Sequence, residues 1–207
     1  MESCGLILLA AGASRRLGQP KQLLMVNGES LLHRSIQVAI ESALGPVILV
    51  LGAHAALIKQ TSLPGNIQIV EHADWSAGMA SSMQAGLQAL LLAAPETAAV
   101  IFMVCDQPYI TASVLRSLQQ KKAATGKKIV YSLYSIGKGV PALFDKSLFS
   151  ELFSLQGDAG AKKLIEQYPG ECASISFPLG NVDVDTREDF EQLSHPNQES
   201  DHAQNEK

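Results

Sequence analysis

The chain has 207 residues, of which 46% are hydrophobic and 17% charged, and its formal net charge is −4. This composition is typical of a soluble globular protein and excludes a disordered chain, while the length suits one α/β domain. The negative charge argues against nucleic acid as a partner, because binding to a phosphate backbone needs an excess of Lys and Arg. Three cysteines without C-x-x-C spacing indicate free thiols.

An apolar run, Leu6 to Ala10, lies near the amino terminus. It has no basic leader and is too short to span a bilayer, so we expect a cytoplasmic protein with no membrane partner. Residues 195–207 are polar and almost free of apolar side chains, which predicts a flexible tail. We therefore expect a single domain over residues 1–194.

A loop of small and basic residues follows the apolar run, in the sequence LAAGASRRLGQPK. The side chains of residues 10–14 are too small to keep a ligand away from the backbone N–H groups. Arg16 and Lys21, with Arg15 as a further candidate, bring positive charge to the same place. The loop therefore predicts a phosphate site at the end of a buried strand, and the alternative is an ordinary strand-to-helix turn with surface arginines.

The glycine spacing excludes two widespread phosphate loops. A Walker loop has four residues between its glycines and then Lys-Ser/Thr, whereas five residues separate Gly12 from Gly18 and Gln19 follows. A dinucleotide fingerprint needs G-x-G-x-x-G, and Gly12 is followed by Ala13 and Ser14. A phosphate site here would be of another kind.

Strands and helices alternate in the next part of the chain. Helical spacing after Ser30, a suitable N-cap, predicts a helix that ends at Gly45-Pro46. The pattern then predicts a strand at 47–51, a helix at 53–60 and a short strand at 67–70. This alternation favours an α/β fold with a parallel sheet covered on both faces.

A predicted helix from Met79 to Leu92 begins with small residues, among them Gly78, Ser81 and Ser82. Such an entry would let a flat ligand lie against the helix start, where hydroxyl and N–H groups are available. Capping and tight helix packing explain the same residues without a ligand.

The most hydrophobic strand is predicted at 98–104, and Asp106 stands at its carboxyl end. Ligands of open α/β sheets bind outside the carboxyl ends of the strands, so this carboxylate lies at the edge of a site. Beside a phosphate loop it would be a natural ligand for Mg²⁺, and otherwise it caps a turn. Thr111 then caps a helix over 112–124.

Strands are also predicted at 127–134 and 140–144, and helices at 147–153 and from about 161. A final short strand carries Asp183 and Asp185, and a helix capped by Asp185 or Thr186 follows. Asp185 is therefore a candidate for a helix N-cap and for a metal ligand, two roles that do not exclude each other.

Six motifs follow one another along the chain: LAAGASRRLGQPK, DWSAGMASSMQAGL, VCDQPYI, GVPALFDKSLF, LQGDAGAKKLI and VDVDTREDF. Together they resemble the MobA-like nucleotidyltransferase family, and most of all its molybdenum cofactor cytidylyltransferase branch. The resemblance implies a three-layer Rossmann-like fold with a mostly parallel central sheet, and an enzyme that uses Mg²⁺ and a nucleoside triphosphate. A phosphate-bearing acceptor would attack the α-phosphate, and pyrophosphate would leave.

The resemblance also implies roles for individual residues. The catalytic residues would be Lys21, Arg16 and Asp106, with Lys21 stabilising the charge that grows at the α-phosphate. Loop and helix-entry residues would bind the nucleotide: Leu9, Ala10, Ala11, Gly12, Ser14, Arg16, Gly18, Lys21, Gly78, Ser81 and Ser82. Mg²⁺ would be held by Asp106 and, by analogy, Asp185, with Asp183 as the neighbouring alternative.

The resemblance implies a donor and an acceptor as well. Residues 9–12 read LAAG, like the cytidylyl branch, whereas members that use GTP tend to read LAGG. This favours transfer of CMP from CTP to a molybdopterin-type cofactor, on behalf of a molybdoenzyme or its maturation factor. The chain departs from many relatives at His72, where they have Asn, and at Val140, where they have the His of Gly-His-Pro.

Three alternatives to this function stay open. GTP could be the donor, or a sugar or polyol phosphate could be the acceptor. The chain could also be a nucleotide-binding delivery protein without catalysis. Among the remaining residues, Trp75 is expected to pack beneath the helix entry or to stack on a base, and Asp158 to begin a helix or to touch the acceptor. Cys105 is expected to be a small buried hydrophobe.

Overall fold

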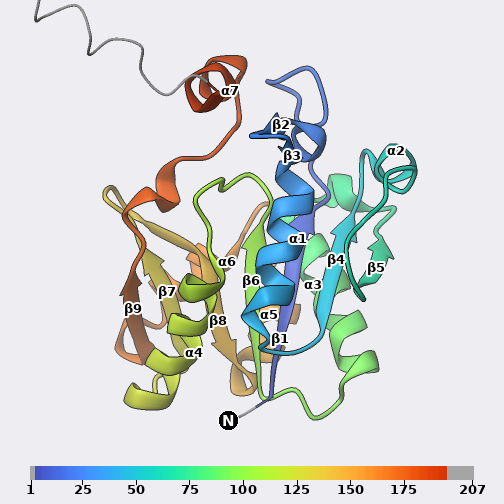
Figure 1. The fold of residues 1–207 in the computed structure, drawn as a ribbon. Coiled ribbons are helices and arrows are strands. Elements are labelled where there is room, and N and C mark those ends of the chain that lie inside the picture. Colours follow the sequence, from blue (N-terminus) through green and yellow to red (C-terminus); the bar gives the residue numbers. More distant parts are fainter. Residues whose placement is uncertain (1–2, 195–207) are drawn as a thin grey trace, which may run out of the picture.

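The computed structural model describes residues 3–194, which form a seven-stranded sheet with helices on both faces (Figure 1). The predicted tail at 195–207 lies outside the described residues. The strands of the sheet are β1 (Cys4–Ala10), β4 (Val47–Leu51), β5 (Gln68–Glu71), β6 (Ala99–Val104), β7 (Ile129–Leu133), β8 (Lys138–Asp145) and β9 (Cys172–Ser176). A separate hairpin is made by β2 (Met25–Val26) and β3 (Glu29–Ser30).

The helices alternate with these strands along the chain. They are α1 (Leu31–Ser42), α2 (Ala55–Ile58), α3 (Met79–Ala93), α4 (Ala112–Thr125), α5 (Phe149–Phe153), α6 (Ala161–Gln167) and α7 (Arg187–Ser194). Short 3-10 turns are η1 (Lys21–Leu23), η2 (Trp75–Ala77), η3 (Lys146–Leu148), η4 (Pro169–Glu171) and η5 (Pro178–Asn181). No helix among the described residues is long and apolar enough to cross a membrane.

The sheet is mostly parallel, as predicted, with the strand order β5-β4-β1-β6-β8-β7-β9. β4, β1 and β6 pair in parallel, and β5 extends this group at one edge. β8 is the exception, because it runs antiparallel to both β6 and β7. A short turn joins β7 to β8, and a short connection between neighbouring strands can only make an antiparallel pair.

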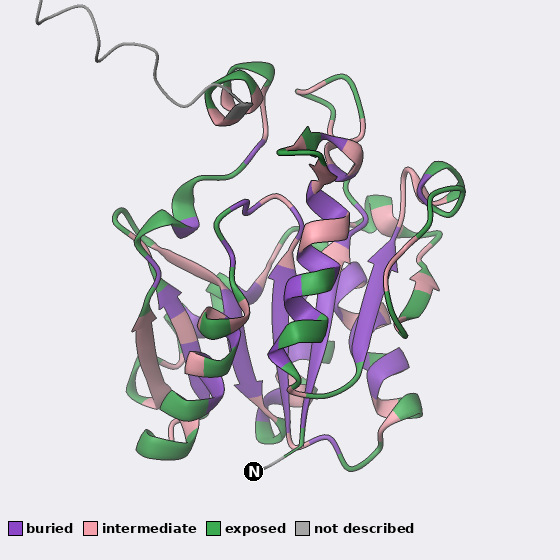
Figure 2. Cartoon of the chain, viewed as in Figure 1, coloured by how far each residue is buried: buried purple, intermediate pink, exposed green. Residues whose placement is uncertain are grey.

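The buried side chains of the sheet separate into two layers of core. Leu6 and Leu8 of β1 pack with α1 and α4 on one face, while Ile7 packs with α3, α5 and α6 on the other. The central strands are buried on both sides, as Figure 2 shows. Because successive residues of a strand point to opposite faces, an unbroken apolar run is what a three-layer fold requires of a central strand.

Two helix starts confirm their predicted caps. The Ser30 hydroxyl accepts a hydrogen bond from the His33 N–H at 3.1 Å and begins α1. The Thr111 hydroxyl accepts one from the Val114 N–H at 3.4 Å and begins α4. These side chains satisfy N–H groups that the first turn of a helix leaves unpaired.

The predicted strand that carries Asp183 and Asp185 is wrong. Residues 182–186 have no ladder partner and follow η5 as irregular chain. The edge position of the sheet belongs instead to β9, which the sequence did not reveal because most of its side chains are only half-buried and its apolar pattern is weak. The segment with the two aspartates leaves the sheet and crosses toward the carboxyl ends of β1 and β6.

Candidate active site

The carboxyl ends of β1 and β6 form the floor of the site. The two strands are parallel neighbours, with Leu9 opposite Val104, so the loops that follow them leave the sheet at the same edge. A cavity of about 410 Å³ opens there. Its lining comes from the ends of β1 and β6 and their loops, from η1, η2 and the start of α3, and from the loop after α5: Leu9, Ala10, Ala11, Gly12, Arg15, Lys21, Gln22, Trp75, Ser76, Gly78, Met79, Ser82, Val104, Cys105, Asp106 and Asp158.

The loop after β1 folds back on itself and is closed by Ser14. This residue has a φ of 51°, and its carbonyl accepts hydrogen bonds from the N–H groups of Leu17 and Gly18. Its hydroxyl accepts a third bond from the Lys21 N–H at 3.1 Å. Ser14 therefore lies outside the cavity lining and fixes where η1 begins, which brings Lys21 to the cavity.

The Lys21 ammonium joins two carboxylates that are distant in sequence. It donates to Asp106 Oδ2 at 2.5 Å and to Asp185 Oδ1 at 2.8 Å. Arg16 donates to Asp185 Oδ2 at 2.5 Å, and its side chain is 71% exposed outside the cavity. The structure therefore brings Lys21, Asp106, Asp185 and Arg16 together in one charged cluster.

The pKa values of the cluster follow from this geometry. Burial acts to lower the pKa of Lys21, but the charge of Asp106 and the hydrogen bonds to both carboxylates outweigh it and raise the pKa. Burial acts to raise the pKa of Asp185, and Lys21 and Arg16 overcome it and lower the pKa. Both groups are therefore charged at neutral pH, which keeps an ammonium and a carboxylate at the cavity edge.

The Asp106 carboxylate has a second oxygen that Lys21 does not contact. Its Oδ1 atom is buried and has no hydrogen-bond partner within residues 3–194. Among the same residues, no group of three or more His, Cys, Asp or Glu side chains is arranged to hold a metal alone. Mg²⁺ takes one or two carboxylates together with substrate phosphates, so Asp106 and Asp185 suit a metal that arrives with a nucleotide.

Asp185 reaches the cluster because the preceding residue is anchored. The Val184 N–H donates to the Asp106 carbonyl at 3.1 Å, and the Val184 side chain is buried in a small cluster with Leu24 and Leu31. Asp185 is not the N-cap of α7.

Thr186 has that capping role, as one of the two predicted alternatives. The Thr186 hydroxyl accepts from the Asp189 N–H at 3.2 Å, and Asp189 Oδ2 accepts from the N–H groups of Thr186 and Asp185. This reciprocal arrangement satisfies the helix start without the Asp185 side chain, which therefore remains available to Lys21.

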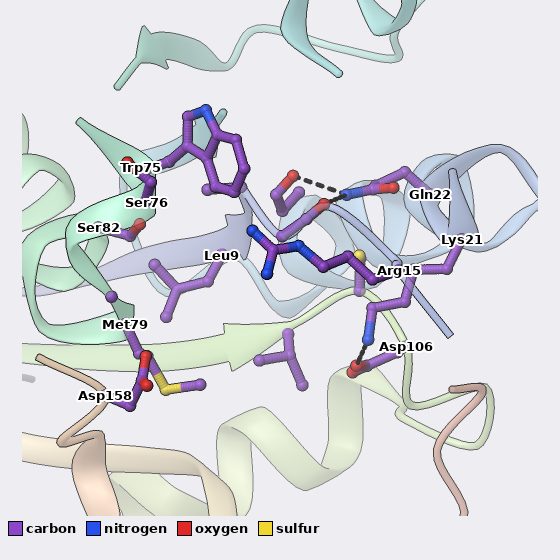
Figure 3. Close-up of a pocket in the computed structure, with 16 residues that line it drawn as sticks. Leu9, Arg15, Lys21, Gln22, Trp75, Ser76, Met79, Ser82, Asp106 and Asp158 are labelled. Atoms are coloured by element: carbon purple, nitrogen blue, oxygen red, sulfur yellow. Dashed lines mark hydrogen bonds and ion pairs between the residues drawn. The ribbon is translucent and has the colours of Figure 1, made fainter. Parts of the chain in front are cut away.

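Gly78 has a packing role at the entry of α3. Its φ is +107°, and a Cβ atom there would lie 2.4 Å from the Gly157 carbonyl group. The Ala80 N–H donates to the Gly157 carbonyl at 3.0 Å, so the loop after α5 lies directly on the helix start. This contact brings Asp158 to the cavity beside Met79, as Figure 3 shows.

The two adjacent serines at the start of α3 differ in their surroundings. Ser82 lines the cavity, whereas Ser81 does not. The Ser81 hydroxyl donates to the Gly78 carbonyl at 2.8 Å and lies 2.9 Å from His72 Nε2. The unexpected histidine at position 72 thus holds Ser81 at the helix start.

Arg15, which the sequence offered only as a further candidate beside Arg16, is the arginine that lines the cavity. The Arg15 guanidinium extends into the cavity between Leu9 and Trp75 (Figure 3). Adjacent arginines in a loop point in different directions, and the sequence does not say which one faces the strand ends. Trp75 packs against the core, as expected, and also lines the cavity.

Cys105 and Gln22 complete the buried part of the lining. Burial, with Asp106 beside it, raises the pKa of the Cys105 thiol to about 12, in keeping with a small buried hydrophobe. Gln22 was not predicted at all, although it is fully buried next to Lys21. Its signal was weak, because a single glutamine after a lysine has no characteristic spacing.

Comparisons with known proteins agree with this architecture. The model of the MobA-like NTP transferase domain matches residues 6–172. The nicotine blue oxidoreductase of Paenarthrobacter nicotinovorans is 31% identical over 90% of this chain and 94% of its own. A probable molybdenum cofactor guanylyltransferase of Bacillus cytotoxicus is 20% identical over 93% of this chain and 97% of its own.

Solved structures are similar over nearly the whole chain. Rv0371c of Mycobacterium tuberculosis H37Rv, in complex with manganese, has a TM-score of 0.77 at 26% identity and covers 93% of this chain and 98% of its own. The matched region, residues 6–172, contains the loop after β1, Lys21 and Asp106. The chain therefore belongs to the MobA-like NTP transferase family of nucleotidyltransferases.

Proposed function

We propose that the protein transfers CMP from CTP to a molybdopterin-type cofactor in a Mg²⁺-dependent reaction that releases pyrophosphate. The observation that carries the proposal is the contact of Lys21 with both Asp106 and Asp185, beside a loop of small residues at the carboxyl edge of the sheet. A phosphate oxygen of the acceptor attacks the α-phosphorus, and the bond from this phosphorus to the β-phosphate oxygen breaks. Such a transfer depends on positioning and electrostatic stabilisation, which these groups supply.

The nucleotide lies in the cavity with its triphosphate on the loop after β1. Gly12 and Ala13 offer backbone N–H groups that have no partner among the described residues, and Arg15 and Lys21 offer positive charge. Arg16 acts through Asp185, whose carboxylate it binds. The base and ribose lie toward Gly78, Ser82 and Trp75.

The metal would be held by Asp106 and Asp185. The unpartnered buried oxygen of Asp106 supports this assignment, because a carboxylate oxygen without a donor is suited to a cation. Bound Mg²⁺ would supply neutralisation of phosphate charge. Lys21 would then turn from the carboxylates toward the α-phosphate, where the same ammonium stabilises the developing charge.

The choice of donor and acceptor rests on separate support. The sequence LAAG at residues 9–12 favours CTP, and the name of the B. cytotoxicus relative supports a molybdenum cofactor as acceptor. That relative is named a guanylyltransferase, so the base requires its own test. A molybdoenzyme or its maturation factor would receive the product.

Pyrophosphate release with Mg²⁺ and freshly generated molybdopterin, compared for CTP, GTP, ATP and UTP, tests the proposal. Release with CTP alone is the expected result, and release with GTP would overturn the choice of base. Release only with sugar or polyol phosphates would move the acceptor to that class.

The P. nicotinovorans relative has an oxidoreductase name, so oxidation of NADH and NADPH is followed in the same mixtures. Redox turnover without pyrophosphate release from any nucleotide would overturn the transferase proposal. Nucleotide binding without either reaction would favour a delivery protein.

A further inference from the structure

Gln22 is a fully buried polar side chain that contacts the loop after β1. Its Nε2 atom lies 2.9 Å from the Ala10 carbonyl oxygen and 3.1 Å from the Gly12 carbonyl oxygen (Figure 3). Both neighbours only accept hydrogen bonds, so the NH₂ group of the amide must face them. The side chain therefore holds two carbonyl groups of the loop at once.

The oxygen atom of the same amide makes no such contact. Gln22 Oε1 is buried and has no hydrogen-bond partner within residues 3–194. An unpaired buried acceptor opposes folding, and an apolar side chain of similar size would avoid that cost. The two donor contacts to the loop are thus what a glutamine supplies here and an apolar residue would not.

The carbonyl between these two is also held. The Ala11 carbonyl accepts from the Ala53 N–H at 3.1 Å, so three successive carbonyls of the loop have fixed partners. In a trans peptide the C=O and the following N–H point in opposite directions. Fixing these carbonyls therefore fixes the directions of the N–H groups of residues 11–13.

The N–H groups of Gly12 and Ala13 have no hydrogen-bond partner within the described part of the chain. Apart from its two chain neighbours, a Cβ atom at Gly12 would meet no atom of residues 3–194 within 4 Å, so the space around this residue is open. Consecutive backbone N–H groups that point to one place can bind an anion. The held carbonyls fix the directions of these two N–H groups before any ligand arrives.

We propose that Gln22 is a positioning residue that presets the loop after β1 for a triphosphate. It acts through the Ala10 and Gly12 peptides and not by contact with the reacting atoms. The inference rests on the proposed function, because that function supplies the triphosphate. Loss of the two hydrogen bonds should weaken binding of the phosphate chain while the cavity walls for the base stay unchanged.

Binding of inorganic tripolyphosphate, measured by calorimetry in the presence of Mg²⁺, tests the proposal without a base or an acceptor. Gln22→Met keeps the length of the side chain and removes the donors, and Gln22→Glu keeps the shape and replaces the donors by acceptors. The matched control is Gln84→Met, because Gln84 Nε2 donates to the carbonyls of Phe153 at 2.9 Å and Leu155 at 2.8 Å, away from this loop. Thermal unfolding is recorded for every variant.

Both Gln22 variants should weaken tripolyphosphate binding by about tenfold or more, and Gln84→Met should bind like the wild type. If a folded Gln22 variant binds like the wild type, the role of Gln22 is refuted while the proposed function stands. If Gln84→Met weakened tripolyphosphate binding equally, the effect of Gln22 would be one of general stability, and the positioning role would also be refuted. If the wild-type protein itself binds no tripolyphosphate, the proposed phosphate site fails together with the inference.

Discussion

Lys21 Nζ lies 2.5 Å from Asp106 Oδ2, although 85 positions separate the two residues in the chain. The contact exists because β1 and β6 are parallel neighbours whose following loops leave the sheet at one edge. A cation and a carboxylate held together in this way can exchange their mutual contact for a phosphate and a metal. The first predictions concern these two residues.

Lys21→Ala should lower turnover by roughly a hundredfold or more, corresponding to about 3 kcal/mol of lost transition-state stabilisation. The reason is that no other side chain would bring an ammonium to the α-phosphate from η1. Steady-state pyrophosphate release measures the loss, and circular dichroism checks that the variant is folded. Turnover near that of the wild type would remove Lys21 from the mechanism.

Lys21→Ala should also bind Mn²⁺ or Mg²⁺ more tightly than the wild type when no nucleotide is present. In the wild-type protein the ammonium contacts both Asp106 and Asp185, and its removal leaves Asp106 without this cation and Asp185 with Arg16 alone. Calorimetric titration of the metal compares the two proteins. Equal or weaker binding by the variant would contradict the proposed shared metal site.

Asp106→Asn should abolish most Mg²⁺-dependent activity, because a carboxylate binds Mg²⁺ far better than an amide does. Asp185→Asn should raise the Mg²⁺ concentration needed for half-maximal rate, whereas Asp183→Asn should have a smaller effect. Asp185 shares Lys21 with Asp106, which is why we choose it over Asp183. An unchanged metal dependence in Asp106→Asn, or a larger effect at Asp183, would refute these assignments.

Gly12→Ala should fold like the wild type and lose affinity for nucleotide. Beyond its chain neighbours, a Cβ at this position meets no atom of the described residues within 4 Å, and it would occupy the space where the phosphate chain is proposed to lie. Gly52→Ala is a useful contrast, since a Cβ there would lie 2.6 Å from the Ala11 carbonyl oxygen and should lower stability. Thermal unfolding and nucleotide titration separate the two effects, and tight nucleotide binding by Gly12→Ala would place the phosphates elsewhere.

Asp145 provides a pH test away from the site. Burial acts to raise the pKa of Asp145, but hydrogen bonds from Lys122 and Ser147 lower it below its ordinary value of 3.8. A depressed carboxylate pKa stabilises the fold above about pH 4 and loses that contribution as the pH falls further. Asp145→Asn should cost about 1 kcal/mol of unfolding free energy at pH 7 and progressively less below pH 4. Denaturant unfolding at pH 7 and pH 3 measures this, and a difference that does not change with pH would contradict it.

Most of the fold could be predicted from sequence because its central strands are unbroken apolar runs. Val47–Leu51 was predicted with its observed bounds, and Ser30 and Thr111 cap the helices that they were expected to cap. The edge of the sheet was harder. β9 is half-exposed, so its apolar pattern is weak. The valines on either side of Asp183, exposed Val182 and buried Val184, imitated a strand that does not form.

Candidate site residues could be predicted where charged side chains follow the end of a buried strand. Lys21 and Asp106 were identified because a basic loop and an acidic residue both follow buried strands. The rest depended on directions that only folding decides. Arg15 enters the cavity, whereas Arg16 binds Asp185. Gln22 donates hydrogen bonds to the loop after β1, and no local sequence pattern predicts these contacts.

The most direct test of the account follows the α-phosphate itself. The wild-type protein is incubated with Mg²⁺, molybdopterin and CTP labelled at the α-phosphate, and the label is traced after separation of the products. We expect the label to move into a molybdopterin product while unlabelled pyrophosphate is released. Label that stays in CTP, under conditions in which the protein binds the nucleotide, would contradict the central claim.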